Sequence, residues 1–483
     1  MKNTKIMLRA LTMLLAVLMI VSVTACKDDG NTDDTGVGTV DTIPEGDEKL
    51  ELPDVNYGGS ELFTILCRSG SNSEYINDIE IKELTTTTDS VDKAVYTRNR
   101  NVETQFGVKI SLISDNDTAI NSAIINTVGS GDDAYDLVAN QGRYVFQHIV
   151  ADRTSDINDF EYIDLDKSWW NQSAKENWAT PGGKIFAMNG DISYLSIGST
   201  AGIYFNKTIL NDAKITLPYT YVREGTWTFE KYKQMIIQAS GAISGDGSGI
   251  LGQDMFAYAT EKYRGPGAII DSTGVPILER QSDGKYKIGV QTQRVYDAAD
   301  AYTELLNSPY SHLGALNDVR SAFAKGTVVF TEDNIKVAPT FSATVDFGIV
   351  PIYKYDDVTE DYPSYIGSGT NTFFILKTVP VGDREFVGVI TEALAYYGQK
   401  LITPVYYDRV LSYQAINSPD DLEMLNIIHD SMQVSFAEYC NPGNICGTLQ
   451  TAFESNTNYS TVIAGLGKAI LLNLESWYAL DNK

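Results

Sequence analysis

The sequence predicts a mixed α/β fold arranged as two blocks that meet at one junction. Residues 62–139 alternate short apolar runs with amphipathic helices in the order β-α-β-α-β, and residues 227–477 resume an α/β pattern. Between these blocks, the stretch 183–207 holds two short runs rich in β-branched and aromatic residues, 185–188 and 203–205. Such runs indicate buried strands, because helices need ten or more residues with a 3.6-residue period. We therefore expect 183–207 to cross from one block to the other.

Length and charge restrict the class of protein. The chain has 483 residues, and more than 400 of them follow Tyr57, which suits two domains or one two-lobed body. The formal net charge is −26. A charge of this sign argues against binding to nucleic acid and against direct adhesion to anionic lipid.

The N-terminus has the pattern of an export signal, predicted to span residues 1–25. Lys2, Lys5 and Arg9 precede the apolar run 11–23, which is too short for a comfortable membrane span. Val23-Thr24-Ala25-Cys26 resembles the lipobox of bacterial lipoproteins. That resemblance implies an acylated Cys26 and a lipid anchor at the membrane. The alternative is an ordinary secretory peptide in which this cysteine is incidental.

Residues 26–56 are expected to form an acidic, flexible tether. The segment carries many Asp, Glu, Gly and Thr residues and no aromatic residue before Tyr57. It contains too little apolar surface to offset the entropy lost on ordering.

The first block can be assigned element by element. A strand is predicted at 62–66 and a helix at 91–106, capped by Asp89 or Ser90 and ended by Gly107. A strand at 108–112, a helix at 119–128 capped by Asp117 and stopped at Gly129, and a strand at 136–139 complete the unit. This order predicts a parallel sheet with right-handed crossovers. Ligands bind beyond the carboxyl ends of such strands, which places Arg68 and Asn140 at one edge.

The second block resumes with a helix opened by Thr228, where Trp227 is expected to pack on Tyr232 as a hydrophobic staple. Strands are predicted at 327–331, 347–351 and 373–376. Helices are predicted around residues 295–306, 386–397, 422–429 and 462–477.

Cysteines and motifs give little sign of catalysis. Cys440 and Cys446 flank a turn-rich loop that a disulfide could close, whereas Cys67 follows an apolar run and is expected to be a buried thiol. No Cys/His cluster has zinc spacing, so we expect no metal and no cofactor. The pattern at 247–252 matches a dinucleotide motif but follows a helix and a glycine-rich loop, so we interpret it as a loop.

Several short patterns occur together in a fixed order. They are Phe106-Gly107-Val108, Tyr135-Asp136-Leu137-Val138, Tyr204-Phe205-Asn206-Lys207, Gly225-Thr226-Trp227-Thr228-Phe229 and Phe347-Gly348-Ile349-Val350-Pro351. Together they resemble the family 1 extracellular solute-binding proteins of ABC importers, the family of maltose-binding protein, from about Leu62 to the C-terminus. Asn140 stands where maltose-binding protein has a stacking tryptophan, so the identity of the ligand does not carry over.

The resemblance implies a two-lobed type II periplasmic-binding-protein fold, each lobe a mostly parallel sheet flanked by helices. Lobe 1 would combine 57–189 with about 352–400, and lobe 2 would combine 193–347 with about 402–483. The crossings would fall near 189–192, 348–351 and 401–404. The ligand, usually a mono- or oligosaccharide in this family, would lie between the lobes.

Candidate ligand contacts follow from sugar chemistry, in which aromatic faces meet C–H surfaces and planar polar groups meet hydroxyls. The eight candidates are Arg68, Asn140, Trp169, Trp170, Asp191, Tyr194, Glu332 and Asn371. Each has a structural alternative: the tryptophans could be core residues, Asp191 a turn residue, and Glu332 a solvated loop carboxylate.

The sequence therefore predicts a non-catalytic, monomeric receptor, lipid-anchored on the extracytoplasmic face of a bacterial membrane. It would capture a carbohydrate and deliver it to an ABC transporter permease. Two alternatives stay open: a surface glycoside hydrolase, for which no carboxylate pair stands out, and a receptor of the same fold for a non-sugar ligand such as a peptide.

Overall fold

The computed structural model describes residues 48–69, 74–84, 89–244, 249–341, 345–412, 418–454 and 459–483. The chain divides into two compact units, Met1–Pro44 and Glu45–Lys483, and every described residue lies in the second. The expected export signal, Cys26 and the tether up to residue 47 lie outside the described residues.

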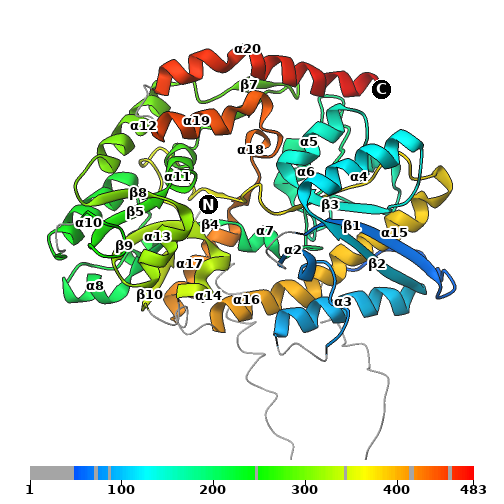
Figure 1. Cartoon of the computed structure of the whole chain (residues 1–483), viewed down its shortest axis with the longest axis horizontal. Coiled ribbons are helices and arrows are strands. Elements are labelled where there is room, and N and C mark those ends of the chain that lie inside the picture. Colours follow the sequence, from blue (N-terminus) through cyan, green and yellow to red (C-terminus); the bar gives the residue numbers. More distant parts are fainter. Residues whose placement is uncertain are drawn as a thin grey trace, which may run out of the picture. The chain divides into compact units, whose positions relative to one another are not determined.

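The first sheet has the strand order β12-β3-β1-β2 within the described residues (Figure 1). Its strands are β1 (Glu61–Arg68), β2 (Val108–Asp115), β3 (Leu137–Gln141) and β12 (Asn371–Phe374). β1 pairs in parallel with β2 and β3, as the β-α-β-α-β order predicts. β12 joins antiparallel to β3, so a strand from late in the chain completes a sheet begun near its start.

The second sheet has the order β10-β4-β9-β5-β8. Its strands are β4 (Ala201–Asn206), β5 (Phe256–Glu261), β8 (Ser311–Gly314), β9 (Val328–Asn334) and β10 (Phe347–Val350). β5 pairs in parallel with β8 and β9, whereas β4 pairs antiparallel with β9 and β10. The α/β class is confirmed, but this sheet is mixed rather than mostly parallel.

Two small pairings complete the strands. β6 (Leu278–Arg280) pairs antiparallel with β7 (Tyr286–Ile288), and β11 (Ser364–Tyr365) pairs in parallel with β13 (Met432–Gln433). The expected strand at 185–188 is wrong, because this run makes only an isolated bridge between Met188 and Phe373. The run at 203–205 does form a strand, β4.

Capping residues fix the helices around the first sheet. Asp89 caps α3 by accepting from the N–H groups of Val91 and Asp92, and Gly107 ends it in the left-handed conformation. α4 runs one residue past Gly129, with Asn116 rather than Asp117 as its cap and Gly131 at its end. The helices near this sheet are α2 (Glu74–Asn77), α3 (Ser90–Phe106), α4 (Asp117–Ser130), α5 (Gly142–Val150), α6 (Gln172–Trp178) and α15 (Arg384–Tyr397).

Local capping and packing residues also fix the helices around the second sheet. Thr228 caps α10, and the ring of Trp227 packs edge-on against Tyr232 at 5.6 Å, which confirms the expected staple. The helices are α7 (Leu195–Gly198), α8 (Lys207–Asp212), α9 (Tyr219–Arg223), α10 (Phe229–Ser240), α11 (Arg264–Ser272), α12 (Gln293–Leu306), α13 (Leu316–Ala324) and α14 (Ala338–Phe341).

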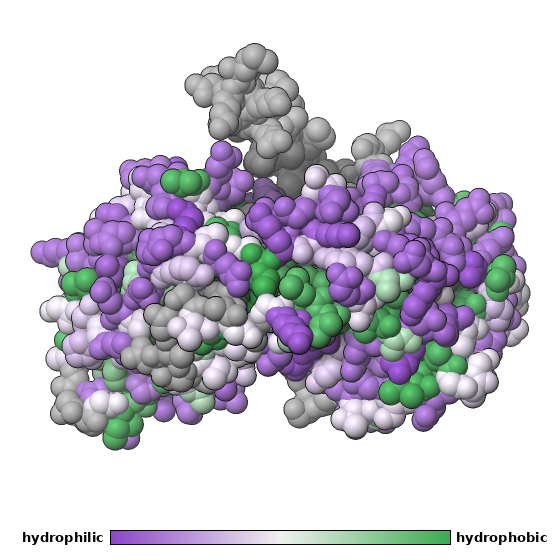
Figure 2. Space-filling view, turned by 90° about the horizontal axis from the view of Figure 1, so that it is seen from above, coloured by the Kyte–Doolittle hydropathy of each residue, from purple (hydrophilic) through white to green (hydrophobic). Residues whose placement is uncertain are grey.

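The C-terminal helices contact both blocks. They are α16 (Thr403–Ser412), α17 (Pro419–Asp430), α18 (Phe436–Cys440), α19 (Ile445–Glu454) and α20 (Tyr459–Tyr478). α20 contacts α12 of the second block and α5 of the first (Figure 1). Seen from above the view of Figure 1, the surface is mostly hydrophilic, with an apolar patch near its centre (Figure 2). No described helix combines the length and apolarity that crossing a membrane requires.

Segments that connect the blocks lie against one another. Asn189 donates from its amide to the carbonyl of Asn371 at 3.2 Å, which joins the first crossing to the strand that returns as β12. A Cβ at Gly398, in the π-helical turn Gly398–Ile402 between α15 and α16, would lie 1.9 Å from the carbonyl oxygen of Asp191. Only glycine permits this approach. The exact boundaries of the two lobes stay a prediction.

The end of the expected tether is part of the folded body. Leu50, Leu52 and Val55 pack against the core of the first block, and Glu48 accepts from the backbone N–H of Ser168 at 3.1 Å. A flexible tether extending to residue 56 is therefore wrong from residue 48 onward. Apolar packing and the contacts of Glu48 and Glu51 with Ser168 and Lys167 both hold this segment against the first block.

Candidate functional site

An open cavity lies beside the N-terminal part of α11. Its atom-free space, including the part open to solvent, is about 900 Å³. Five parts of the chain line it: the start of β4, α11 with Tyr263 before it, Ile277, the segment 352–367, and α18 with α19. Residues distant in sequence thus meet around one space, as a ligand site requires.

The sequence around α11 dictates how it approaches the second sheet. A Cβ at Gly265 would lie 1.9 Å from the hydroxyl of Tyr302 on α12 and 2.7 Å from the side-chain oxygens of Thr260 and Tyr258 on β5. Glycine therefore allows the helix to start this close to α12 and β5. Arg264 is fixed beside it. Its guanidinium donates to the side-chain oxygen of Asn334, and Nε lies 3.4 Å from Asp333 and 3.7 Å from Glu261. This arginine is therefore held by groups of β5 and β9 while it lines the cavity.

Two carboxylates from different elements line the same space. Asp271 comes from α11 and Glu438 from α18. The backbone N–H of Ser368 donates to Glu438 at 3.2 Å. Burial raises the pKa of Asp271 well above its usual value, and the charge of Glu438 raises it further. Burial also raises the pKa of Glu438, partly offset by the Ser368 hydrogen bond and the charge of Arg264.

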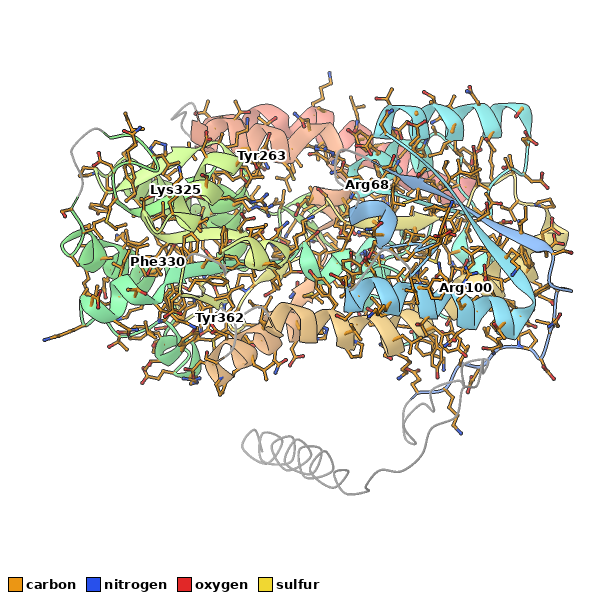
Figure 3. All side chains as sticks on the ribbon, turned by 60° about the horizontal axis from the view of Figure 1, so that its bottom comes forward. Arg68, Arg100, Tyr263, Lys325, Phe330 and Tyr362 are labelled. Carbon is orange, nitrogen blue, oxygen red and sulfur yellow. The ribbon has the colours of Figure 1, made fainter. Side chains whose placement is uncertain are left out.

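Tyrosine side chains complete the lining. Tyr263 lines the cavity and is 52% exposed. Figure 3 labels it on the block opposite Arg68. Tyr365 lines the interior, where burial and the charges of Asp271 and Glu438 raise the pKa of its hydroxyl, which stays protonated. Carboxylate acceptors beside aromatic rings suit a ligand with both hydroxyls and C–H faces.

None of the eight candidate residues from the sequence lines this cavity. Trp169 and Trp170 are buried in the core of the first block, 1% and 2% exposed. Both indole N–H groups donate to Glu392 of α15 at 2.8 Å. Neighbouring residues point to one carboxylate because they lie in an irregular segment rather than in a helix, so the structural alternative is the one observed.

The two candidates at the first crossing are held by the protein itself. Asp191 accepts from the hydroxyl of Thr403 at 3.3 Å, and burial raises its pKa to about 7. The ring of Tyr194 stacks on Tyr406 at 4.7 Å, and its backbone N–H donates to Asp78 at 2.9 Å. Both residues connect the crossing to neighbouring segments.

Arg68, Asn140 and Asn371 do meet at the edge of the first sheet, as the strand order predicts, but they are buried there. Arg68 donates to the carbonyl of Gly369. Asn140 accepts from the backbone N–H of Gln141 at 2.8 Å, and Asn371 donates to Asp78 at 3.1 Å. Their polar groups stabilise loops at this edge.

Glu332 is not a loop carboxylate. It lies within β9, 2% exposed, and accepts from the hydroxyls of Tyr232 at 3.1 Å and Tyr258 at 3.0 Å. Burial raises its pKa to about 7. The expectation that it faces the edge is wrong because β9 runs three residues further than its apolar run suggests.

The sequence reasoning missed the residues that do line the cavity. Tyr263-Arg264-Gly265-Pro266-Gly267 carries an available signal, since glycine and proline at a helix start beside an arginine and a tyrosine are typical of a binding loop. The sequence around Glu438 carries no such signal, because only the tertiary position of α18 brings this residue close to α11.

The three cysteines that the structure describes, Cys67, Cys440 and Cys446, form no disulfide. The thiol of Cys446 donates to the carbonyl of Ala437 at 3.5 Å. The possible Cys440–Cys446 disulfide is therefore not formed. In the part of the chain that the structure describes, no group of three or more His, Cys, Asp or Glu side chains could hold a metal ion.

No protein-family model matches the chain, and no curated protein matches it in sequence. Solved structures do match. The galacto-N-biose/lacto-N-biose I-binding protein of an ABC transporter from Bifidobacterium longum, in complex with lacto-N-biose, is 12% identical with a TM-score of 0.59; the match covers 87% of this chain and 99% of that one.

Two further structures are similar to a comparable degree. The cyclic α-maltosyl-1,6-maltose binding protein from Arthrobacter globiformis is 14% identical with a TM-score of 0.58, over 86% of this chain and 100% of that one. UgpB from Mycobacterium tuberculosis, in complex with glycerophosphocholine, is 15% identical with a TM-score of 0.55, over 79% and 95%. The chain therefore has the two-lobed fold of these substrate-binding proteins.

Proposed function

We propose that this protein is an extracytoplasmic receptor that captures a carbohydrate and delivers it to an ABC transporter. The observation that carries the proposal is the cavity beside α11, where two carboxylates and two tyrosines meet in a fold shared with sugar-binding receptors. The proposal names the class of ligand and not the compound, because the similar structures are 12–15% identical and bind different compounds.

The lining of the cavity supports a polyhydroxyl ligand. Asp271 and Glu438 can each accept hydrogen bonds from two ligand hydroxyls, and Gln450 can both donate and accept. The exposed ring of Tyr263 offers a flat surface for the C–H face of a sugar ring. Apolar residues of α11 and α19 form the remaining wall, which is typical of ligand sites.

Ligand binding would act by hinge closure. The chain connects the two sheets between β3 and β4 and again between β10 and β12, and Asn189 of the first connection donates to Asn371 at the end of the second. The turn at Gly398, near the proposed third crossing, lies against Asp191 of the first connection. A ligand that contacts both sides of a hinge favours the closed form by its difference in affinity for the two forms. A permease can then distinguish loaded from empty receptor. Lobes at 57–189 with about 352–400, and 193–347 with about 402–483, remain part of this proposal.

The anchor is a separate part of the proposal. Cys26 in the lipobox-like Val23-Thr24-Ala25-Cys26 would carry the lipid, and the acidic residues before 48 would lift the folded body off the membrane. Metabolic labelling with a fatty-acid probe tests this directly. The wild-type chain should take up label and a Cys26→Ser variant should not; labelling of both would contradict the anchor.

The receptor function is tested by calorimetry of the purified folded body against a panel of oligosaccharides and peptides. We expect micromolar or tighter binding of a carbohydrate, and a smaller radius of gyration by X-ray scattering when it is bound. Binding of peptides with no response to any sugar would replace the ligand class while leaving the fold intact. Because UgpB is in complex with glycerophosphocholine, this compound is added to the panel as a third class of ligand.

A second candidate function, glycoside hydrolysis, is favoured by one observation: Asp271 and Glu438 line the same cavity and burial raises both pKa values. Paired carboxylates of this kind serve as acid and base in glycosidases. Incubation of each sugar that binds, followed by chromatography, distinguishes the two. Recovery of intact sugar supports the receptor, and release of shorter products supports the enzyme.

A further inference from the structure

The cavity beside α11 presents an excess of negative charge to a ligand. Asp271 and Glu438 contribute two carboxylates, and Arg264 is the only cationic side chain among the described lining residues. The guanidinium of Arg264 is already engaged outside the cavity, because its Nε lies 3.4 Å from Asp333 and 3.7 Å from Glu261. Among the described residues, neither lining carboxylate therefore has a cation within ion-pair distance.

Asp271 also differs from the other buried carboxylates of this protein. Four carboxylates whose pKa burial raises to about 7 each accept at least one hydrogen bond within the protein: Asp78, Asp191, Glu332 and Glu392. No described residue donates to the side chain of Asp271, and both burial and the charge of Glu438 raise its pKa. A carboxylate that has left water without gaining donors is costly. Its oxygens are therefore available to a ligand.

The two carboxylates act on the same part of the cavity. Their charges both raise the pKa of the Tyr365 hydroxyl and of the Cys446 thiol, and these two groups line the cavity as well. α19, which carries Cys446, contacts both α11 and α18 (Figure 1). A group that enters the cavity between α11 and α18 therefore meets the negative charge of both side chains.

A protonated amine has the chemistry that this pair lacks. An ammonium group carries one positive charge and three N–H donors, so it can donate to both carboxylates and to one further acceptor, such as the amide oxygen of Gln450. Hydrogen bonds between charged partners are about twice as strong as neutral ones. A metal ion fits less well, because the described residues hold no group of three or more His, Cys, Asp or Glu side chains that could bind one. The tyrosine rings suit the C–H faces of a sugar that carries the amine.

We propose that the ligand of this receptor is an amino sugar whose unacetylated, protonated amine lies between Asp271 and Glu438. The inference rests on the receptor function proposed above and narrows its class of ligand. A neutral sugar can enter the same cavity but does not supply the positive charge. Binding of any sugar therefore tests the receptor, whereas the difference between an amino sugar and its neutral counterpart tests this inference.

Binding of the amine should release protons. Burial keeps protons on Asp271 and Glu438 in the ligand-free protein, and a cation between them favours the ionised forms. The affinity should therefore rise with pH until the amine itself loses its proton. The other ionisable groups that act on this pair keep their charge state over that range: a guanidinium remains charged, and burial keeps the phenols and the thiol neutral. They are Arg264, Tyr353, Tyr365, Tyr439 and Cys446.

Three disaccharides that share one backbone isolate the charge. Cellobiose carries a hydroxyl at C2 of each ring, N,N′-diacetylchitobiose carries a neutral acetamide there, and chitobiose carries the amine. By calorimetry at pH 7, chitobiose should bind at least about 10-fold more tightly than cellobiose, and the acetylated form should show no such gain. Glucose, galactose and mannose, each beside its 2-amino and 2-acetamido form, repeat the comparison on single rings.

Substitutions test whether the two carboxylates recognise the amine. Asp271→Asn and Glu438→Gln should each weaken binding of the amino sugar about 10- to 150-fold, because a charged acceptor is lost. Binding of the neutral sugar should fall only about 2- to 13-fold, as for a neutral hydrogen bond. Asp318→Asn, on α13 and outside this cavity, is the control and should change neither affinity. Circular dichroism checks that each variant is folded.

Proton release is measured by calorimetry at pH 6 in phosphate and in Tris, two buffers with different ionisation enthalpies. Wild type should release protons on binding the amino sugar, Asp271→Asn should release fewer, and neutral sugars should release none. Equal affinity for the amino and neutral sugars would overturn the inference and leave the receptor function intact, and so would tighter binding of the amine without proton release. Failure of every sugar to bind, neutral or aminated, would overturn the receptor function and this inference with it.

Discussion

The side-chain amide of Asn371 donates to the buried carboxylate of Asp78 at 3.1 Å, across 293 residues of sequence. Asp78 also accepts from the hydroxyl of Ser193 and from the backbone N–H of Tyr194 at 2.9 Å. One carboxylate thus holds the loop after β1, the first crossing and the strand that returns to the first sheet. Arg98, fully buried on α3, donates to the carbonyls of Ile79 and Ile192 and stabilises the same junction.

Replacement of Asp78 by Ala should destabilise the protein strongly. It leaves three donors without their acceptor and removes the carboxylate whose charge favours the buried Arg98 guanidinium. Breaking a buried charged network costs about 3–5 kcal/mol. Urea unfolding followed by circular dichroism measures the loss. Asp132→Ala, at an exposed position, is the control and should change the free energy of unfolding by about 0.5 kcal/mol or less. Equal effects of the two variants would show that the network contributes nothing.

Stability should fall as the pH rises from about 4.5 to about 7. Burial raises the pKa values of Asp78, Asp191, Glu332 and Glu392 to about 7, from ordinary values of 3.8 or 4.5. Between the ordinary pKa and the raised pKa, these carboxyl groups keep protons in the folded protein that they have released in the unfolded chain. The resulting stabilisation is complete below the ordinary pKa and is lost as the pH rises through the raised pKa. His148 acts in the opposite direction, because burial lowers its pKa to about 4.

Thermal unfolding from pH 4.5 to 8 checks this sign, and Glu332→Gln isolates one contribution. The amide oxygen can accept from one of Tyr232 and Tyr258 and the NH2 group can donate to the hydroxyl of the other, but the side chain cannot ionise. Its Tm should decline less with pH than that of wild type. A Tm that rises steadily up to pH 8 in both proteins would contradict the argument.

Substitutions in the cavity beside α11 should weaken sugar binding without unfolding the protein. Asp271→Asn and Glu438→Gln keep the shape but replace one acceptor oxygen by an NH2 donor, and a hydrogen bond contributes about 0.5–1.5 kcal/mol, or about 2- to 13-fold in Kd. Tyr263→Ala removes the exposed ring. Asp318→Asn, which lines a different cavity on α13, is the control. Calorimetry with the best sugar of the panel measures Kd, and unchanged values for Asp271→Asn, Glu438→Gln and Tyr263→Ala would remove this cavity from consideration.

Two glycine-to-alanine substitutions should change the stability of the protein in opposite directions. In Gly398→Ala the new Cβ meets the backbone oxygen of Asp191 at 1.9 Å, which no side-chain rotation can relieve, so the variant should lose at least about 2 kcal/mol of stability. Gly129 lies in α4 with no atom within 4 Å of an added Cβ. Gly129→Ala should gain about 0.5–1 kcal/mol. Denaturant midpoints measure both, and a harmless Gly398→Ala would show that the first and third crossings do not touch.

Local patterns in the sequence predicted the elements well where one physical cause dominates. Asp89 as a cap, Gly107 as a stop and the Trp227–Tyr232 staple are all confirmed, because each depends on residues within a few positions. The strand at 185–188 failed for the opposite reason. Its apolar residues are buried by contacts with β12, and burial alone does not make a strand.

The cavity beside α11 could not be predicted from the sequence, because it is formed by segments that are distant along the chain. Trp169 and Trp170 have the composition of sugar contacts, yet Glu392, more than 220 residues later, accepts both indole N–H groups and places them in the core. Glu438 shows the converse, an unremarkable carboxylate that becomes part of a cavity because α18 lies beside α11. Periodicity gives the face that a residue occupies, but not the partner across that face.

The position of α18 has a thermodynamic consequence. This helix has only five residues, and of two adjacent ones Glu438 lines the cavity beside α11 while the ring of Tyr439 packs against Trp178 of α6 at 4.8 Å. A ligand in that cavity that shifts α18 would therefore also change the packing of α18 on α6, in the first block. Linkage requires the effect to be reciprocal, so a change in this packing alters the affinity for the ligand.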